Sequence, residues 1–306
     1  MSKKAKTSLI AAAALIVIGL GLFCIVMTVY HWDFSRLNTE KFETNTYEIS
    51  EDFDRIILNS DTSDILFAAS DRDICSVICY EPESTKHSVK AEDGALTIRT
   101  ADNRKWYDHI AIRFNSPRVT VYLPKAEYAS LSVKGSTGDI TLQNEMTLDH
   151  ADISVSTGDI RIDHLSAGTL DLSVSTGEIT VSDVTCRGDI NISSTTGNVK
   201  MTNVTCQSLL SGGSTGDIAL RNVIAAGKLS IERSTGDIIF NASDAAEISM
   251  KTSTGDVTGS FLTEKEFAAE TSTGSISVPR NAEGGRCGII TSTGNIKIEI
   301  SDGSDE

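Results

Sequence analysis

Oxygen-bearing side chains recur in this 306-residue chain at one fixed place, directly after a glycine that occurs nine times. The residues in this position are Asp139, Asp159, Glu178, Asn198, Asp217, Asp237, Asp256, Ser275 and Asn295. Carboxylates stacked about 5 Å apart would repel one another, and a bound Ca²⁺ would relieve that repulsion. Three copies, however, carry an uncharged oxygen acceptor, which favours hydrogen bonding within a turn over metal binding. The sequence therefore predicts neither a metal site nor a cofactor.

The remaining ionisable residues do not form a catalytic pattern. A polysaccharide lyase or hydrolase needs carboxylates, or a carboxylate with a base, converging in a cleft. The repeats keep a length of 19 or 20 residues, which leaves no room for the long loops that wall such a cleft. Four histidines lie in no repeated or paired arrangement, and we expect them at the surface: His87, His109, His150 and His164. The sequence therefore predicts that the protein is not an enzyme.

The six cysteines show no CxxC pair and no His/Cys spacing that suits zinc. Cys75 and Cys79 alternate with Val77 on one face of a strand-like segment, and we expect them in the core. Cys186 and Cys206 each lie nine residues after a repeated glycine, in adjacent copies. Stacked neighbours would have Cα atoms about 4.8 Å apart, which permits a disulfide. Alanine fills the same position in other copies, so the sequence leaves this bond open.

One polar and aromatic segment interrupts the repetition. Lys105, Trp106 and Tyr107 bring a large aromatic ring beside a cation. Such residues are enriched at the centres of binding interfaces, although aromatic rings packed in a cap have the same composition. We treat the segment as the candidate contact with a partner.

The repeated glycines define the elements that would position these residues. They are Gly138, Gly158, Gly177, Gly197, Gly216, Gly236, Gly255, Gly274 and Gly294. Two residues after every one stands Ile or Val, and apolar residues alternate with polar ones on both sides of the glycine. This period of two, interrupted once at each glycine, predicts an all-β parallel β-solenoid in which each copy is one coil. Glycine suits the corner because it adopts a positive φ without a Cβ clash.

The N-terminal segment predicts attachment to a membrane. Residues 9–30 are uncharged and mostly apolar, and as a helix they would extend about 33 Å, enough to cross a bilayer. Three lysines precede this segment, so we expect an uncleaved signal anchor with residues 1–8 in the cytoplasm and the rest outside. The net charge of −15 makes nucleic acid a poor partner.

The segments between the anchor and the repeats are less regular. We expect residues 31–50 to form a stalk and residues 51–130 to form an irregular part that caps the solenoid. The regular coils would occupy residues 131–300, and residues 301–306 would form an acidic tail. Solenoids need atypical ends because an open β edge recruits other strands.

The order of several phrases resembles the bacterial DUF4097 family of adhesin-like proteins. These phrases are residues 53–57 (FDRII), 94–98 (GALTI) and 119–125 (VTVYLPK), followed by serial Ser-Thr-Gly-Asp-Ile copies. The resemblance covers residues 53–300. It implies a right-handed, pectate-lyase-like β-solenoid on a membrane-anchored protein of the bacterial envelope, and it brings no catalytic residues.

Three functions fit this sequence to different degrees. The first is a membrane-anchored, extracytoplasmic adhesin-like scaffold or binding module that contacts surface polymer or an envelope protein. The second is a sensor of envelope stress that acts on a membrane partner through its helix. The third, a polysaccharide lyase or hydrolase, is disfavoured because the repeat leaves no cleft.

Overall fold

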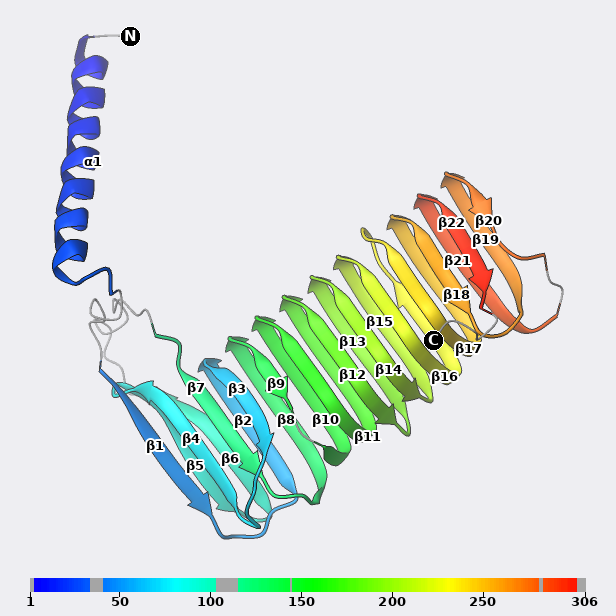
Figure 1. Ribbon diagram of the computed structural model, residues 1–306, viewed down its shortest axis with the longest axis horizontal. Coiled ribbons are helices and arrows are strands. Elements are labelled where there is room, and N and C mark those ends of the chain that lie inside the picture. Colours follow the sequence, from blue (N-terminus) through cyan, green and yellow to red (C-terminus); the bar gives the residue numbers. More distant parts are fainter. Residues whose placement is uncertain (1–2, 34–40, 103–114, 144, 281–282, 302–306) are drawn as a thin grey trace.

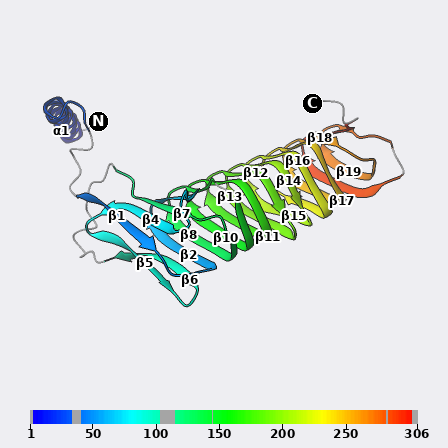
Figure 2. The ribbon, with the colours of Figure 1, turned by 60° about the horizontal axis from the view of Figure 1, so that its bottom comes forward.

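The computed structural model describes residues 3–33, 41–102, 115–143, 145–280 and 283–301. It contains one helix, α1 (Lys3–Val29), and a single sheet system that coils along one axis (Figures 1 and 2). The predicted all-β solenoid with one N-terminal helix is therefore confirmed.

The helix α1 meets the length and composition needed to cross a membrane. Its segment Ala5–Val29 has a mean hydropathy of 3.0, and none of its apolar window is buried against the rest of the chain. Leu9, Ile16 and Ile25 are each more than half exposed. A soluble helix would hide such side chains in a core, so this pattern fits a lipid environment.

The strands have the following bounds. They are β1 (Phe42–Ile49), β2 (Arg55–Thr62), β3 (Asp64–Ala69), β4 (Cys75–Pro82), β5 (Thr85–Glu92), β6 (Ala95–Asp102), β7 (Arg118–Leu123), β8 (Glu127–Thr137), β9 (Ile140–Leu142), β10 (Met146–Thr157), β11 (Ile160–Thr176), β12 (Ile179–Cys186), β13 (Asp189–Thr196), β14 (Val199–Cys206), β15 (Ser208–Thr215), β16 (Ile218–Glu232), β17 (Ile238–Thr254), β18 (Val257–Phe261), β19 (Lys265–Thr273), β20 (Ile276–Ser277), β21 (Gly285–Thr293) and β22 (Ile296–Ile300).

The aliphatic residue two positions after each corner glycine forms a column inside the stack. Ile140 pairs in register with Ile160, Ile160 with Ile179, and Ile179 with Val199, all in parallel strands. These four side chains are fully buried. The predicted rungs therefore lie directly on one another and seal the branched side chains in a continuous core.

A second corner, which the sequence reading did not anticipate, bends five of the coils six residues after the glycine. The residues there take positive φ without being glycine: His164, Asp183, Asn203, Asn222 and Ala242. Asn and Asp tolerate this conformation better than other residues. Asn203 donates to Asp183 at 2.8 Å, and Asn222 donates to Asn203 at 3.0 Å, so the corner carries its own hydrogen-bond ladder.

The last two coils do not follow chain order, contrary to our expectation that successive coils stack. The coil β21–β22 lies between β17–β18 and β19–β20 (Figure 1). Cys287, Ile289 and Ile296 in the inserted coil are buried, whereas Ile276 in the outer coil is 45% exposed. The more apolar coil thus occupies the position with neighbours on both sides.

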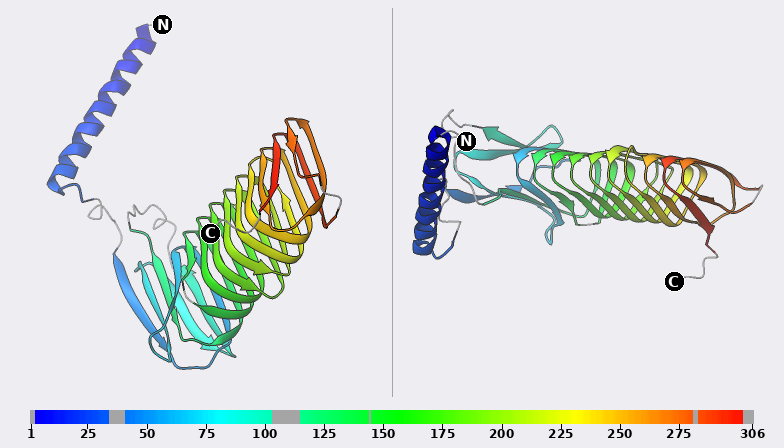
Figure 3. Two further views of the ribbon diagram at one scale, coloured as in Figure 1. Left: turned by 45° about the vertical axis from the view of Figure 1, so that its right-hand side comes forward. Right: turned by 90° about the horizontal axis from the view of Figure 1, so that it is seen from above.

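The N-terminal end is also out of order. The first coil, β2–β3, lies between β6–β7 and β8–β9, with parallel pairing on both sides. Beyond it the strands become antiparallel, because β4 pairs with β7 and β1, and β5 pairs with β6. We call this antiparallel part, β1 with β4–β7, the N-terminal cap; Figure 3 shows it at one end of the stack.

The cap corrects one predicted boundary. The stalk was expected to run from residue 31 to residue 50, but Phe42–Ile49 forms strand β1 along β4. Tyr47 on this strand packs against the core, and Ile49 is buried. The folded part therefore begins at residue 42, with residues 30–41 between α1 and β1 along the chain.

Candidate functional site

The nine corner glycines fix the chain where the coil turns. All have φ between +126° and +154°, a conformation that residues with a Cβ rarely adopt. A Cβ on Gly177 would lie 1.9 Å from the carbonyl oxygen of Gly158 in the neighbouring coil. Glycine is required both for its backbone conformation and for the close approach of adjacent coils.

The oxygen-bearing residue after each glycine joins the coils in a ladder. The backbone N–H of Asp159 donates to Asp139 Oδ1 at 2.9 Å. The same contact joins Glu178 to Asp159, Asp217 to Asn198, Asp237 to Asp217, Asp256 to Asp237, Asn295 to Asp256 and Ser275 to Asn295. An amide oxygen accepts this bond as well as a carboxylate does, which explains why Asn occupies the same position.

Glu178 is the exception in this column. Its carboxylate accepts from Thr180 at 3.1 Å and forms an ion pair with Lys200 at 2.8 Å. The hydrogen bond from Lys200, followed by the one from Thr180, lowers the pKa of Glu178 against the opposing effect of burial. The longer side chain of Glu178 thus binds Thr180 of β12 and Lys200 of the adjacent strand β14.

A shallow groove crosses the outer face of the sheet that precedes the glycine corner. It has a volume of about 430 Å³, and its lining includes Asp152, Asp171, Asn191, Leu210, Gly212 and Glu232. Asn191 donates to Asp171 at 2.7 Å, and Leu210 is 42% exposed. Gly212 has no side chain and leaves the groove open at its position. The groove therefore combines carboxylate acceptors with the aliphatic side chain of Leu210.

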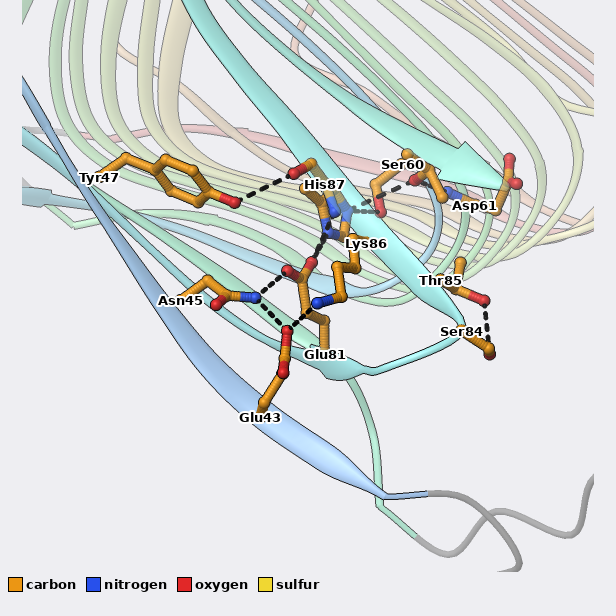
Figure 4. Close-up of polar contacts among 11 residues, drawn as sticks. Glu43, Asn45, Tyr47, Ser60, Asp61, Glu81, Ser84, Thr85, Lys86 and His87 are labelled. Atoms are coloured by element: carbon orange, nitrogen blue, oxygen red, sulfur yellow. Dashed lines mark hydrogen bonds and ion pairs between the residues drawn. The ribbon is translucent and has the colours of Figure 1, made fainter. Parts of the chain in front are cut away.

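A buried polar cluster lies where the N-terminal cap meets β2 (Figure 4). His87 Nδ1 is 2.7 Å from Glu81 Oε2, and His87 Nε2 is 3.1 Å from Ser60 Oγ. The order hydroxyl, imidazole, carboxylate is that of an activated nucleophile. Ser60 and His87 are each only 4% exposed, however, and the void beside His87 has a volume of about 10 Å³. This space cannot admit a substrate, so the present geometry gives a structural hydrogen-bond relay.

The same cluster connects strand β1 to β4 and β5. Asn45 on β1 donates to Glu81 at 2.8 Å and to Glu43 at 2.8 Å, and Glu43 pairs with Lys86 on β5 at 2.5 Å. The hydrogen bonds from Lys86 and Asn45 lower the pKa of Glu43. Tyr47 donates to the carbonyl oxygen of His87 at 3.3 Å, and its burial raises its pKa.

Sequence reasoning missed this cluster. His87 was predicted at the surface, but it is buried because Thr85 and His87 occupy the inward positions of β5. Glu81 continues the inward alternation of Cys75, Val77 and Cys79 along β4. The sequence signal that could have revealed the cluster was the alternation of inward and outward positions, which places Glu81 and His87 on the inward side of their strands. A tight β4–β5 turn then brings Glu81 and His87 face to face.

The other predicted residues have mixed outcomes. Cys75 and Cys79 are buried in the core as expected, and His150 and His164 are exposed as expected. Lys105, Trp106, Tyr107 and His109 lie outside the described residues.

The two cysteines of the open disulfide lie in adjacent coils. Cys186 and Cys206 are both buried free thiols, and Cys186 Sγ donates to the carbonyl oxygen of Gly168 at 3.4 Å. Thr185 and Thr205, the residues directly before them, are register partners. The sequence left a disulfide between Cys186 and Cys206 open, and the structure describes both residues as free thiols.

Comparison with known proteins agrees with this architecture. The family model described as Toastrack DUF4097 matches residues 53–300, from the start of the first coil to the end of β22. The chain belongs to the DUF4097 family. Among curated proteins, none matches this member of the family.

One solved structure shares the fold at low sequence identity, and two others are similar at lower TM-scores. A "putative adhesin" from Bacteroides fragilis superposes with a TM-score of 0.52 at 18% identity, covering 85% of this chain and 98% of its own. A "putative adhesin" from Parabacteroides merdae reaches 0.44 at 12% identity, with 85% and 97% of the two chains covered. A "putative lipid binding protein" from Parabacteroides distasonis reaches 0.43 at 15% identity, with 84% and 97% covered. At 18% identity, the likeness to the Bacteroides fragilis protein concerns the fold alone.

Proposed function

We propose that this DUF4097 protein is a membrane-anchored, non-enzymatic binding module of the bacterial cell envelope. Its outer-face groove would bind an extended surface polymer, with a cell-wall polysaccharide as the favoured class. The single observation that carries the proposal is the groove of Asp152, Asp171, Leu210 and Glu232, which runs across successive coils.

The chemistry of the groove suits a neutral, hydroxyl-rich chain. Carboxylates of Asp152, Asp171 and Glu232 accept hydrogen bonds from hydroxyl groups, and Leu210 offers apolar contact to a sugar ring face. The coils repeat at about 4.8 Å, so a long ligand would meet similar side chains at regular intervals. Because each contact is weak and exposed, the affinity would depend on the number of coils engaged.

A binding experiment with matched variants tests this role. Full-length protein in detergent is incubated with purified insoluble wall polysaccharide, and the bound fraction is measured over a concentration series. Gly212→Lys projects a long side chain into the groove without a backbone clash, since a Cβ there meets nothing within 4 Å. We expect at least about a tenfold weaker affinity, equivalent to about 1.4 kcal/mol.

The control places the same charge on the outer face of the segment that follows the corner glycine. Ile239→Lys replaces a side chain that is 47% exposed on β17, away from the groove, and we expect unchanged binding. If the wild type does not bind any wall polymer, or if both lysine variants weaken binding equally, the groove is not the binding site.

We also propose that the helix α1 anchors the protein in the membrane, and this part of the proposal has its own test. We expect residues 1–8 in the cytoplasm and the solenoid outside, because three lysines precede the apolar helix. Intact cells producing the full-length chain with a cytoplasmic N-terminal tag would be treated with external protease. The solenoid should be digested while the tag remains. Protection of the solenoid would place it in the cytoplasm, and release of an untethered solenoid would identify a cleaved signal peptide.

A further inference from the structure

We infer that Cys79, Glu81 and His87 in the N-terminal cap form a binding site for a transition-metal ion, with Zn²⁺ as the best match. One ligand atom from each residue lies within 4.8 Å of the other two: a thiol sulfur, a carboxylate oxygen and an imidazole nitrogen. The site is separate from the proposed polymer groove.

The strand geometry brings the three ligands together. Cys79 and Glu81 are two residues apart on β4, so their side chains point to the same, inward side. His87 occupies an inward position on β5, which follows β4 after a short turn. Cys79 and Glu81 are fully buried and His87 is 4% exposed, so each ligand is already withdrawn from water.

The donor set favours zinc over calcium or magnesium. Thiolate, imidazole and carboxylate are the three ligand types that Zn²⁺ accepts, whereas Ca²⁺ and Mg²⁺ require oxygen ligands. A thiolate and a carboxylate together would neutralise the two charges of the ion. Binding would release the thiol proton of Cys79, and the resulting site would bury no net charge.

Neighbouring residues already orient two of the ligands. Asn45 donates to Glu81 Oε1, and the backbone N–H of His87 donates to Glu81 Oε2 at 2.7 Å. With Nδ1 of His87 on the metal, Nε2 would carry the proton and donate to Ser60 Oγ, 3.1 Å away. Outer partners of this kind are typical of zinc-binding histidines and carboxylates.

Metal binding would require the hydrogen-bonded pair of His87 and Glu81 to open slightly. His87 Nδ1 and Glu81 Oε2 are 2.7 Å apart as hydrogen-bond partners. Around a tetrahedral zinc with bonds of 2.0–2.1 Å, two such atoms lie about 3.3 Å apart. The pair must separate by about 0.6 Å, which side-chain rotation can supply.

The competing explanation is a simple buried His–Glu hydrogen bond, and it differs in the role of Cys79. That explanation uses Glu81 and His87 but gives the thiol nothing beyond apolar packing. The metal site uses all three residues. A measurement that reports on sulfur coordination therefore separates the two explanations.

Cobalt substitution provides that measurement. Full-length protein in detergent is treated with a chelator, dialysed, and titrated with Co²⁺ while the absorption spectrum is recorded. We expect one Co²⁺ per chain, a thiolate-to-cobalt charge-transfer band in the near ultraviolet and tetrahedral d–d bands in the visible. Stoichiometric Zn²⁺ should abolish these bands.

Three variants complete the test. Cys79→Ser should lose the charge-transfer band, while Cys287→Ser, which removes another buried thiol far along the stack, should keep it. Asn45→Ala should weaken Co²⁺ affinity by about 10–100-fold, as for other outer partners. Circular dichroism of each variant checks that the solenoid is folded. Failure of the folded wild type to bind Co²⁺ or Zn²⁺, or a full charge-transfer band in folded Cys79→Ser, would overturn the proposal.

Discussion

At the scale of single residues, backbone contacts between adjacent coils decide which side chains are tolerated. Gly177 has a φ of +148°, and a Cβ there would press on a backbone oxygen. A Cβ on Gly212 in β15 would meet no atom within 4 Å. Two glycines of the same stack therefore have opposite tolerance to alanine.

Gly177→Ala should destabilise the fold by about 3 kcal/mol, because it combines backbone strain with a clash between coils. Guanidinium denaturation of the full-length chain in detergent, followed by circular dichroism, measures this change. Gly212→Ala is the matched control and should stay within about 0.5 kcal/mol of the wild type. Equal effects of the two substitutions would contradict the assigned role of the corner.

Arg233 is a second residue whose role depends on its neighbours. Its guanidinium is buried and donates from Nη1 to the carbonyl oxygen of Ser194 at 3.1 Å, while Nε and Nη2 lack hydrogen-bond partners in the described part of the chain. Burial lowers the pKa of Arg233. The side chain fits because Gly213 leaves space for Nη1.

Arg233→Met should therefore be neutral or stabilise the fold by up to about 2 kcal/mol, since it removes a buried, poorly compensated charge at similar volume. The same denaturation experiment measures the change. A loss of more than about 1 kcal/mol would show that the single bond to Ser194 outweighs the cost of burying the charge.

At the scale of elements, an ion pair spans the inserted coil near the C-terminal end. Lys265 begins β19, pairs in register with Gly285 of β21, and reaches Asp244 of β17 at 2.5 Å. Lys265 is 3% exposed and also donates to Thr263 at 2.6 Å. One side chain thus connects the two coils on either side of the inserted strand.

Lys265→Ala should destabilise the C-terminal coils by about 3–5 kcal/mol, because it leaves the buried carboxylate of Asp244 without its cation. Hydrogen exchange of β19 and β21 measures this loss locally. Lys251→Ala removes an exposed partner of Glu232 and should cost at most about 1 kcal/mol. Similar exchange rates in the two variants would mean that Lys265 does not fasten this end.

At the scale of the whole molecule, the coils at both ends are out of chain order. Thr293 is in register with both Thr254 and Thr273, so the coil containing Thr293 lies between the other two. Register neighbours in adjacent strands lie about 4.8 Å apart, and second neighbours lie about twice as far. The order of the coils is therefore measurable by crosslinking.

We predict that Thr254→Cys combined with Thr293→Cys forms a disulfide, and that Thr254→Cys combined with Thr273→Cys does not. All three positions are exposed, and only the first pair falls within disulfide range. Mass spectrometry after mild oxidation of the full-length chain detects the bond. The reverse result would show that the coils stack in simple chain order.

The sequence by itself determined the solenoid, because every coil packs the same kinds of side chains against equivalent neighbours. The β-branched residue two positions after each glycine, represented by Ile140, Ile160 and Ile179, indicated the register of the core, and the glycine indicated the corner. The oxygen acceptors directly after each glycine predicted hydrogen bonds within the turn, whereas the structure has them joining the corners of adjacent coils. The apolar run before residue 31 predicted a helix that could span a membrane.

Only the tertiary structure decided what breaks the repetition. The order of the end coils is set by strand pairing, β21 with both β17 and β19, which local periodicity does not predict. The cluster of Ser60, Glu81 and His87 depends on how the β4–β5 turn packs against β2, which lies earlier in the chain. Because Glu81 and His87 lie before the repeated coils, the repeat pattern does not contain this cluster. Periodic positions are fixed by identical neighbours and can be read from the chain, whereas unique positions are fixed by neighbours that only folding brings together.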